Sequence, residues 1–471
     1  MTAARARTAP IADSSWRGLA DELTGRLWLP DQAPYDAKRK LFNKRYPDVR
    51  PAGVASVRTV RDVQRCLRWA ADTDLPVVAR STGHSYAGYS VNEGLVIDLA
   101  ALNGVRVDES TGLVTVGGGT TMAELYPALR RHQVAFPAGN SPTVGIGGLT
   151  LGGGVAAVSR AFGLTCDALV ETTVVTAEGA VLTCNATENA DLFWACRGGG
   201  GGNFGINTSF TFQAREVPDV SVFGLVWSST DPVELLTVLQ QIVQRAPDGF
   251  SARLGLDTGG LDRGQVRDNL RVSAVGLFLG PADQLRQILE PALAVATPVR
   301  RHIAELDYWE GNEYLRHDTS ADRFAARTRV STEPLSPEVL GILLSRLRDW
   351  PGSRNPDGAG VGLFSWGGAI NHVPATGTAF VHRDALFLVC MDTSWTARDP
   401  RELVAAHHQW LAELYSATGA HLPHAAYQNF TDPDLHDWRT AYYGGNYARL
   451  LDVKRRYDPD SLFRFDQGIG S

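Results

Sequence analysis

The chain of 471 residues is 44% hydrophobic and 20% charged, which excludes wholesale disorder and predicts about two or three domains. Its formal net charge of -6 argues against nucleic acid or an anionic membrane as the main partner, because basic surfaces bind phosphate groups. No apolar run is long enough for a membrane-spanning helix, and the N-terminal segment MTAARARTAPIADSS lacks the apolar core of a secretory signal. Five scattered cysteines predict neither a disulfide scaffold nor a metal site, so we expect a cytoplasmic protein without a metal.

Short strands and helices joined by glycine-rich loops are predicted for the first part of the chain. Thr59 can cap a helix that carries an apolar stripe from Val60 onward. The segments LPVVAR, LVIDLA and GLVTVGGG are typical of short strands. Thr121-Met-Ala-Glu124 is a capping box that predicts a second helix, ending near His132.

Glycine dominates several of the segments that follow. Residues 137–154 are predicted as one long loop, and ETTVVTAEGAVLTC as a β-hairpin with its turn at Glu178-Gly179. Residues 200–205 match GxGxxG formally, but they follow no clean strand and open no helix, so a Rossmann site is not predicted. A P-loop and the GxSxG elbow of serine hydrolases are both missing.

The second part of the chain has a different pattern. Residues 216–420 alternate strands such as RVSAVGLFLG and DALFLVCMD with amphipathic helices such as PVELLTVLQQIVQRA. This pattern predicts an α+β domain with an antiparallel sheet. Near the C-terminus, the helix ARLLDVKRRY is expected to stop at Asp458-Pro459.

The glycine clusters indicate a cofactor. Most of the clusters among the 48 glycines lie between Gly83 and Gly205. Glycine loops let backbone N–H groups converge on a phosphate because no Cβ obstructs the approach. Several separate loops of this kind predict a large, polyphosphate-bearing cofactor that is bound from more than one side.

Six ordered motifs then carry a resemblance. RSTGHSYAGYS, PAGNSPTVGIGGLTLGGG, GLTCDALVETTVVTAEG, DLFWACRGGGGGNFG, YQNFTDPDL and YYGGNYARLLDVKRRYDPDSLFRFDQGI together resemble the berberine bridge enzyme-like family of FAD-linked oxidases, within the vanillyl-alcohol oxidase superfamily. The resemblance implies an α+β fold with a two-part FAD-binding domain of PCMH type. That domain would comprise residues 1–215 and 421–471, with a substrate domain of an antiparallel sheet covered by helices at 216–420.

The resemblance assigns His84 to the covalent attachment of FAD. In RSTGHS this histidine occupies the position where the family joins the flavin 8α-methyl group to an imidazole nitrogen, and a neutral imidazole is the nucleophile that this chemistry needs. The family's second attachment, a cysteine, corresponds to Ser141, which cannot form a thioether. Cys166 lies in a different motif and is expected to be a packed thiol. We therefore expect FAD attached through His84 only.

Further cofactor contacts follow from the resemblance. The loop around His84 would surround the pyrophosphate, and the 143–153 segment would line the diphosphate and the flavin ring. The small Val144 occupies a position that governs O2 access and is compatible with oxidase behaviour, whereas Asn446 would lie near the flavin, cap the following helix, or do both. The full expected set is Arg80, Ser81, Thr82, Gly83, His84, Ser85, Gly88, Gly139, Ser141, Thr143, Val144, Gly145, Gly147, Gly148, Gly152, Gly153 and Asn446.

The catalytic base is less clearly marked. Many family members carry Tyr-x-Asn-Tyr with the second tyrosine as proton acceptor, but here Phe430 replaces it. Tyr86, beside the attachment site, is the first choice, and Tyr427, His372 and Glu310 are alternatives. A tyrosine base needs a lowered pKa. The two tyrosines could instead pack the cavity wall, and an amine substrate would need no protein base.

The resemblance implies an FAD-dependent oxidoreductase. It would oxidise a small organic molecule, an alcohol, an amine or an activated C–H, by hydride transfer to flavin N5, with O2 reduced to H2O2, in bacterial secondary metabolism. The alternatives are a dehydrogenase or an oxidative cyclase or oxygenating enzyme of the same fold with little oxidase turnover. A flavin-binding protein without catalytic activity is the third functional hypothesis. Neither the substrate nor the oligomeric state is predicted.

Overall fold

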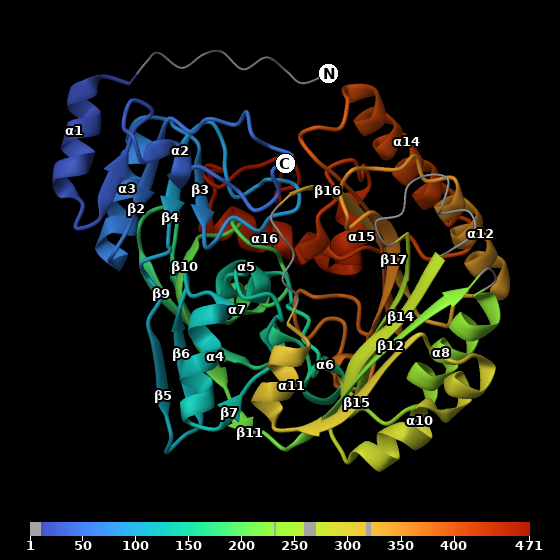
Figure 1. The fold of residues 1–471 in the computed structure, drawn as a ribbon. Helices are drawn as coiled ribbons and strands as arrows, with labels where there is room; N and C mark the ends of the chain where they lie inside the picture. Colours follow the sequence, from blue (N-terminus) through green and yellow to red (C-terminus); the bar gives the residue numbers. More distant parts are fainter. Residues whose placement is uncertain (1–10, 230–231, 259–269, 317–321) are drawn as a thin grey trace.

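The computed structural model describes residues 11–229, 232–258, 270–316 and 322–471. Most of the segment on which the expectation about a secretory signal rests therefore lies outside the described residues. The chain forms two lobes that lie side by side, one from the first half of the sequence and one from the second (Figure 1). No helix within the described ranges has the length and apolar run needed to cross a bilayer.

The first lobe contains a four-stranded sheet at its outer edge. Its strands, in sheet order, are β1 (Arg26–Trp28), β2 (Gly53–Ser56), β4 (Leu95–Asp98) and β3 (Val77–Arg80). β4 pairs in parallel with both β2 and β3. Helix α3 (Val60–Asp72) begins at the predicted cap. The Thr59 side chain accepts a hydrogen bond from the Asp62 N–H, and the Asp62 side chain accepts one from the Thr59 N–H. The apolar stripe of α3, including the buried Cys66, packs into the core of this sheet.

A five-stranded antiparallel sheet forms the centre of the same lobe. In order its strands are β5 (Val105–Asp108), β6 (Leu113–Gly117), β10 (Ile206–Gln213), β8 (Leu169–Val175) and β9 (Val181–Asn185). The β8–β9 hairpin has the predicted turn, with Gly179 at φ +81°. Helix α4 (Met122–Arg131) starts at the predicted Thr121–Glu124 capping box.

The predicted loop at 137–154 needs correction. Residues Ile146–Leu151 form helix α5, in spite of Gly147 and Gly148. The helix forms because Ile146 and Leu151 are buried in the core, and tertiary packing outweighs the poor helix propensity of glycine. A further short helix, α7 (Ala190–Ala195), precedes the 198–205 glycine loop, which leads into a strand as expected.

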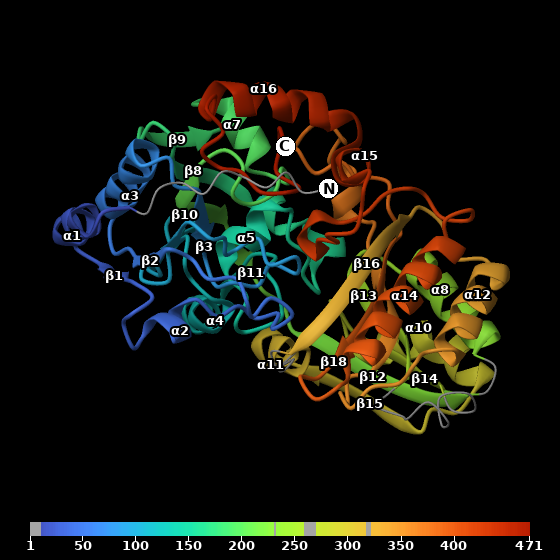
Figure 2. The ribbon, with the colours of Figure 1, turned by 90° about the horizontal axis from the view of Figure 1, so that it is seen from above.

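The second lobe is a seven-stranded antiparallel sheet. In order its strands are β15 (Arg300–Leu306), β12 (Val220–Ser229), β14 (Leu270–Phe278), β13 (Phe250–Asp257), β17 (Ala359–Ser365), β18 (Phe387–Trp395) and β16 (Arg323–Ser331). Four helices cover its outer face: α8 (Val233–Arg245), α10 (Ala282–Val295), α12 (Pro337–Arg348) and α14 (Arg401–Ala417). Figure 2 shows these helices on the side of the sheet away from the first lobe.

The C-terminal segment returns to the first lobe, where α16 (Tyr447–Tyr457) lies against α7 (Figure 2). Lys454 on α16 donates to the carbonyl of Asn203 in the glycine loop, to the Asp458 carboxylate and to the Phe463 carbonyl. Buried charge of this kind is satisfied only when all three partners are in place. The remaining elements are α1 (Asp13–Glu22), α2 (Tyr35–Lys38), β7 (Val134–Ala135), α6 (Ser159–Phe162), β11 (Arg215–Glu216), α11 (Tyr308–Tyr314), α13 (Ala369–His372), α15 (Trp438–Tyr443) and the short 3₁₀ turns Thr165–Asp167, Gln428–Phe430 and Gly444–Asn446.

Candidate functional site

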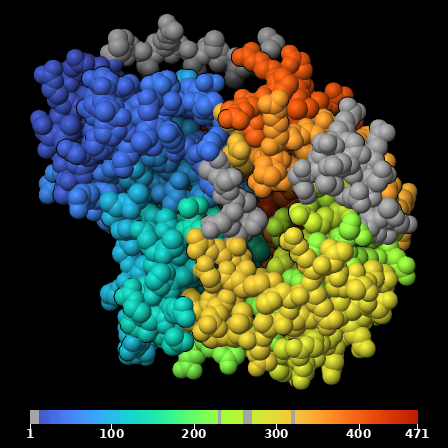
Figure 3. Space-filling model, in the orientation of Figure 1, coloured from blue at the N-terminus to red at the C-terminus, as the bar shows by residue number. Residues whose placement is uncertain are grey.

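A cavity of about 360 Å³ extends between the loops of the first lobe and reaches the C-terminal segment. The two lobes meet along a hollowed seam in Figure 3. The cavity is lined mainly by five stretches of chain: residues 77–92, 141–151, 200–207, 428–431 and 464–467. It is thus assembled from segments that are far apart in the sequence.

Three glycines leave bare backbone along the cavity wall. A Cβ on Gly148 or Gly202 would meet no atom within 4 Å, and one on Gly201 would meet its first neighbours at 3.9 Å. We call Gly148, Gly201 and Gly202 the glycine cradle. Four buried polar atoms of the lining have no hydrogen-bond partner among the described residues: Ser90 Oγ, Gln428 Oε1, Arg464 Nε and Gln467 Oε1. Buried polar groups of this kind require partners, so the cavity fits a large ligand rich in donors and acceptors, as FAD is.

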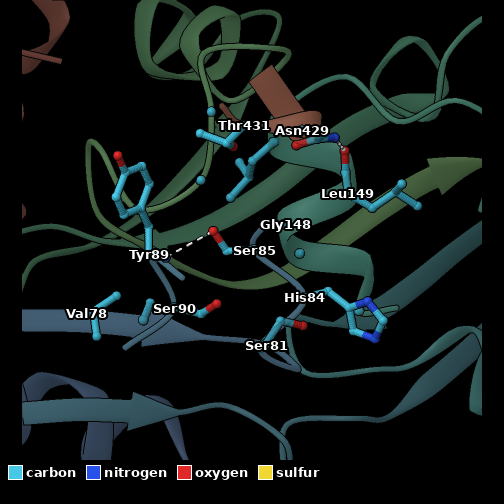
Figure 4. A pocket seen from close by; sticks show the side chains of 18 of the residues that line it. Val78, Ser81, His84, Ser85, Tyr89, Ser90, Gly148, Leu149, Asn429 and Thr431 are labelled. Carbon is cyan, nitrogen blue, oxygen red and sulfur yellow. Dashed lines mark hydrogen bonds between the residues drawn. The ribbon is translucent and has the colours of Figure 1, made fainter. Parts of the chain in front are cut away.

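His84 lies at the cavity on the loop that follows β3 (Figure 4). Gly83 turns this loop with φ +85°, and the His84 ring stacks on Phe42 with ring centroids 4.0 Å apart. His84 Nε2 lies 2.9 Å from Thr143 Oγ1. Burial lowers the pKa of His84 to about 4, so the imidazole is neutral at neutral pH. A hydrogen on Nε2 would leave the lone pair of Nδ1 available as a nucleophile.

Many of the expected cofactor residues meet at this cavity. Those that line it are Ser81, Thr82, Gly83, His84, Ser85, Ser141, Val144, Gly145, Gly147 and Gly148. The loop is held in place by local bonds: Ser81 Oγ donates to the Gly118 carbonyl, and the Tyr89 N–H donates to Ser85 Oγ, as the dashed line in Figure 4 shows. Thr143 does not line the cavity, but its hydroxyl contacts the ring of His84, which does.

Other expected residues lie behind the wall. The Arg80 guanidinium lies 3.3 Å from the Asp98 carboxylate, and Gly88 packs so closely under Tyr46 that a Cβ would clash with the ring. The Gly139 carbonyl accepts from the Tyr126 hydroxyl. These three positions and Gly152, Gly153 and Asn446 do not line the cavity.

Three of these positions have packing roles instead. A Cβ on Gly152 would clash with Asn429, and one on Gly153 with Phe380. The Asn446 amide donates to the carbonyls of residues 375, 378 and 379. Asn446 makes no capping bond to α16 and does not line the cavity.

Several lining residues were not assigned from the sequence. They are Tyr89, Asn92, Gly200, Gly201, Gly202, Asn203, Gln428, Asn429, Thr431, Tyr442, Tyr443, Arg464, Phe465 and Gln467. Most lie inside motifs already recognised, such as DLFWACRGGGGGNFG and YQNFTDPDL. Asn429 Nδ2 donates to the Leu149 carbonyl (Figure 4), which ties the C-terminal segment to α5.

An aromatic wall separates the cavity from the seven-stranded sheet. Tyr86 lines the cavity and stacks on Phe430 with centroids 4.9 Å apart, while Phe324 of β16 meets its edge at 4.8 Å. Within the described residues the Tyr86 hydroxyl has no hydrogen bond. Burial raises the pKa of Tyr86, Cys390 and Asp392 add to this increase, and Arg253 opposes it. The raised pKa disfavours the phenolate that a tyrosine base needs.

Tyr427 is placed away from the cavity. Its hydroxyl accepts from the Gly154 N–H and from Asn429 Nδ2, both at 3.0 Å, and its ring is buried against Trp366. Burial raises the pKa of Tyr427 in spite of these two donors. The alternatives His372 and Glu310 are exposed and do not line the cavity. A structural role for Tyr427 therefore fits its surroundings better than a catalytic one.

Asp392 on β18 was not among the residues predicted from the sequence. Phe387, Val389 and Met391 alternate into the helix-covered core, so Cys390 and Asp392 face the other side of the sheet, toward the first lobe. Burial raises the pKa of Asp392 to about 6, although Arg253 nearby opposes the increase. An acidic residue in the middle of the apolar strand FLVCMDTSW was the available signal.

Comparison with known proteins defines the class first. A family model described as an FAD binding domain matches residues 51–185, the part that carries β3, His84 and α5. A second model, described as berberine and berberine like, matches residues 426–470, which supply Gln428, Arg464 and Gln467 to the same cavity. The fold and the site thus define an FAD-linked oxidoreductase.

Relatives that match nearly the whole chain identify the family. The chain is 31% identical to the FAD-linked oxidoreductase YgaK and 33% identical to YvdP, both from Bacillus subtilis (strain 168), over 95% of its length and 97% and 98% of theirs. The solved BBE-like 1 protein of Physcomitrella patens is 28% identical and superimposes with a TM-score of 0.86 over 97% of this chain and 98% of its own. The chain belongs to the berberine bridge enzyme-like family of FAD-linked oxidoreductases.

Proposed function

We propose that this oxidoreductase oxidises a small organic molecule at a C–H bond next to oxygen or nitrogen. FAD, when bound, accepts two electrons from the substrate and passes them to O2, which yields H2O2. The observation that supports the proposal is the position of Tyr86: it belongs to both the cofactor cavity and the aromatic wall in front of the seven-stranded sheet. Substrate would bind between these two surfaces.

His84 would hold the cofactor covalently and alone. The loop geometry presents a neutral imidazole, and Thr143 engages Nε2, so Nδ1 is the nitrogen that we assign to the bond. Ser141 also lines the cavity but carries no thiol. The five described cysteines are all buried, and burial raises the pKa of Cys166 well above its usual value, so it stays an unreactive thiol.

Asp392 would take the proton of the substrate's O–H or N–H group. Burial raises the pKa of its carboxyl to about 6, so the group is mostly ionised at pH 7. Asp392 does not line the cavity itself, but it lies on the sheet face toward the first lobe, and its charge acts on the Tyr86 phenol. The free Tyr86 hydroxyl would donate a hydrogen bond to the substrate and orient it. This assignment replaces our first choice of Tyr86 as the base.

The test uses the purified holoenzyme under anaerobic conditions. Alcohols and amines are screened for bleaching of the flavin absorbance, and the reduced enzyme is then mixed with O2 in a stopped-flow instrument while H2O2 is measured. Bleaching followed by fast reoxidation with H2O2 supports the oxidase. Bleaching with slow reoxidation would identify a dehydrogenase, and a flavin that no substrate bleaches would contradict the proposal.

A further inference from the structure

One cation on the seven-stranded sheet, Arg253, has no ion pair or hydrogen bond among the residues that the structure describes. Arg253 of β13 is exposed and lies on the sheet face opposite to the helices, because Ala252 and Leu254 beside it point into the helix-covered core. By contrast, Arg271 on the neighbouring strand β14 lies 2.7 Å from the Asp257 carboxylate.

The residues around Arg253 position its guanidinium. The group lies over the Phe364 ring, 5.3 Å from the centroid. The register pairs Gly255 of β13 with Gly362 of β17, and a Cβ on Gly362 would lie 3.4 Å from Arg253 Nε. The Phe364 ring lies equally close, at 3.4 Å, so the missing side chain at Gly362 makes room for the guanidinium over the ring. The planar fork of N–H donors of an arginine matches the two oxygens of a carboxylate.

Arg253 is connected to the cofactor cavity by a series of rings. Phe364 meets Phe430 edge to face with centroids 5.9 Å apart, and Phe430 stacks on Tyr86, which lines the cavity. These rings form a continuous aromatic path from the cavity wall to Arg253. No ion pair within 4.0 Å joins Arg253 to Asp392, although the charge of the guanidinium acts to lower the pKa of that carboxyl.

We propose that Arg253 binds an anionic group of the substrate, and specifically a carboxylate, so that the molecule oxidised at this cavity is an organic acid. The inference rests on the proposed function, and it names the substrate class for that site. Arg253 is a binding residue that determines specificity, whereas the oxidised C–H lies at the cavity end of the ring series. A neutral sugar or simple alcohol would leave the cation unpaired.

Binding of two isosteric probes tests the inference without requiring turnover. Benzoate and benzamide are titrated into the holoenzyme by calorimetry, and we expect benzoate to bind at least about tenfold more tightly. Arg253→Gln should remove this preference by weakening benzoate binding at least about tenfold while benzamide changes less than about twofold. Arg253→Lys keeps the charge but not the planar fork, so its benzoate affinity should lie between those of the wild type and Arg253→Gln.

Arg286→Gln is the matched control, because it removes the same charge from α10 on the outer face of the sheet. It should leave both affinities unchanged. Equal binding of the two probes, undetectable benzoate binding, or an unchanged benzoate affinity in Arg253→Gln would each overturn the inference. Failure of the proposed function is a separate result, in which benzoate binds as expected but no acid, alcohol or amine bleaches the flavin.

Discussion

The cofactor cavity and the sheet face in front of it are built from different kinds of chemistry. On the cofactor side, the glycine cradle and the His84 loop present backbone and one nucleophilic ring, and they come from continuous stretches of sequence. On the sheet side, Arg253, Phe364 and Asp392 are single side chains from three different strands. A cofactor shared by a whole family is thus bound by contiguous motifs, whereas substrate recognition depends on isolated positions that a single substitution can change.

The largest expected effect is the loss of covalent flavin on substitution of His84. In His84→Ala all covalent flavin should be lost, because no other nucleophile in the described part of the chain faces the cavity in suitable form. Acid precipitation followed by peptide mass mapping checks this: wild-type flavin should stay with the His84 peptide. His372→Ala, which changes an exposed histidine outside the cavity, should keep the bond. A flavinylated peptide that contains Cys166 would contradict single attachment.

The sheet side is tested most strongly at Asp392. Asp392→Asn should slow anaerobic flavin reduction by an alcohol by roughly 10²–10⁴-fold, the usual contribution of a general base. In the wild type the rate should rise with pH through about 6, because the carboxylate must be ionised, and the variant should lack this limb. A pH profile that is the same in both proteins would remove Asp392 from the mechanism.

The stability of the same variant gives an independent check. The pKa of Asp392 is higher in the folded chain, at about 6, than the usual 3.8, so the folded state favours the proton and stability falls as pH rises between these values. In Asp392→Asn no carboxyl at this position has to ionise in the folded protein, so this loss of stability is absent. The thermal midpoint of Asp392→Asn should exceed that of the wild type at pH 7.5 and match it at pH 4. A less stable variant at pH 7.5 would show that the carboxylate is structural.

The glycine cradle can be blocked by adding a side chain. Gly148→Leu should lower the amount of bound flavin several-fold, since the new side chain would project into the open space of the cavity. Leucine favours helix, so α5 itself should persist and circular dichroism should be unchanged. Gly341→Leu on α12, another glycine with open space around its Cβ position, should bind flavin normally. Full flavin content in Gly148→Leu would place the cofactor elsewhere.

The smallest effect is expected at Tyr427. Tyr427→Phe removes the acceptor for the Gly154 N–H and for Asn429 Nδ2 and should lower the free energy of unfolding by ~1–3 kcal/mol. Flavin reduction should change by less than about threefold, since the hydroxyl does not line the cavity. Urea unfolding and stopped-flow reduction measure the two quantities. A large loss of rate at unchanged stability would restore Tyr427 as the base.

Local sequence predicted the parts of the fold that local chemistry controls. The capping boxes at Thr59 and Thr121 and the hairpin turn at Gly179 each depend on residues only a few positions apart. The loop of His84 was identified in the same way, by a contiguous motif. Helix α5 was missed because its stability comes from burial of Ile146 and Leu151 rather than from the propensity of IGGLTL.

The α+β fold class, the FAD-binding family and the position of His84 could be predicted from the amino-acid sequence, because contiguous motifs in a fixed order carry them. Which residues share the cavity, and which charged groups have partners in the described part of the chain, depends on the tertiary structure. It placed Tyr427 behind the wall and Asp392 where its charge acts on Tyr86, and it placed Arg253 over Phe364 with no ion pair in the described part of the chain. Strand register and the packing of the two lobes set these relations, and both depend on contacts between residues that lie far apart along the chain.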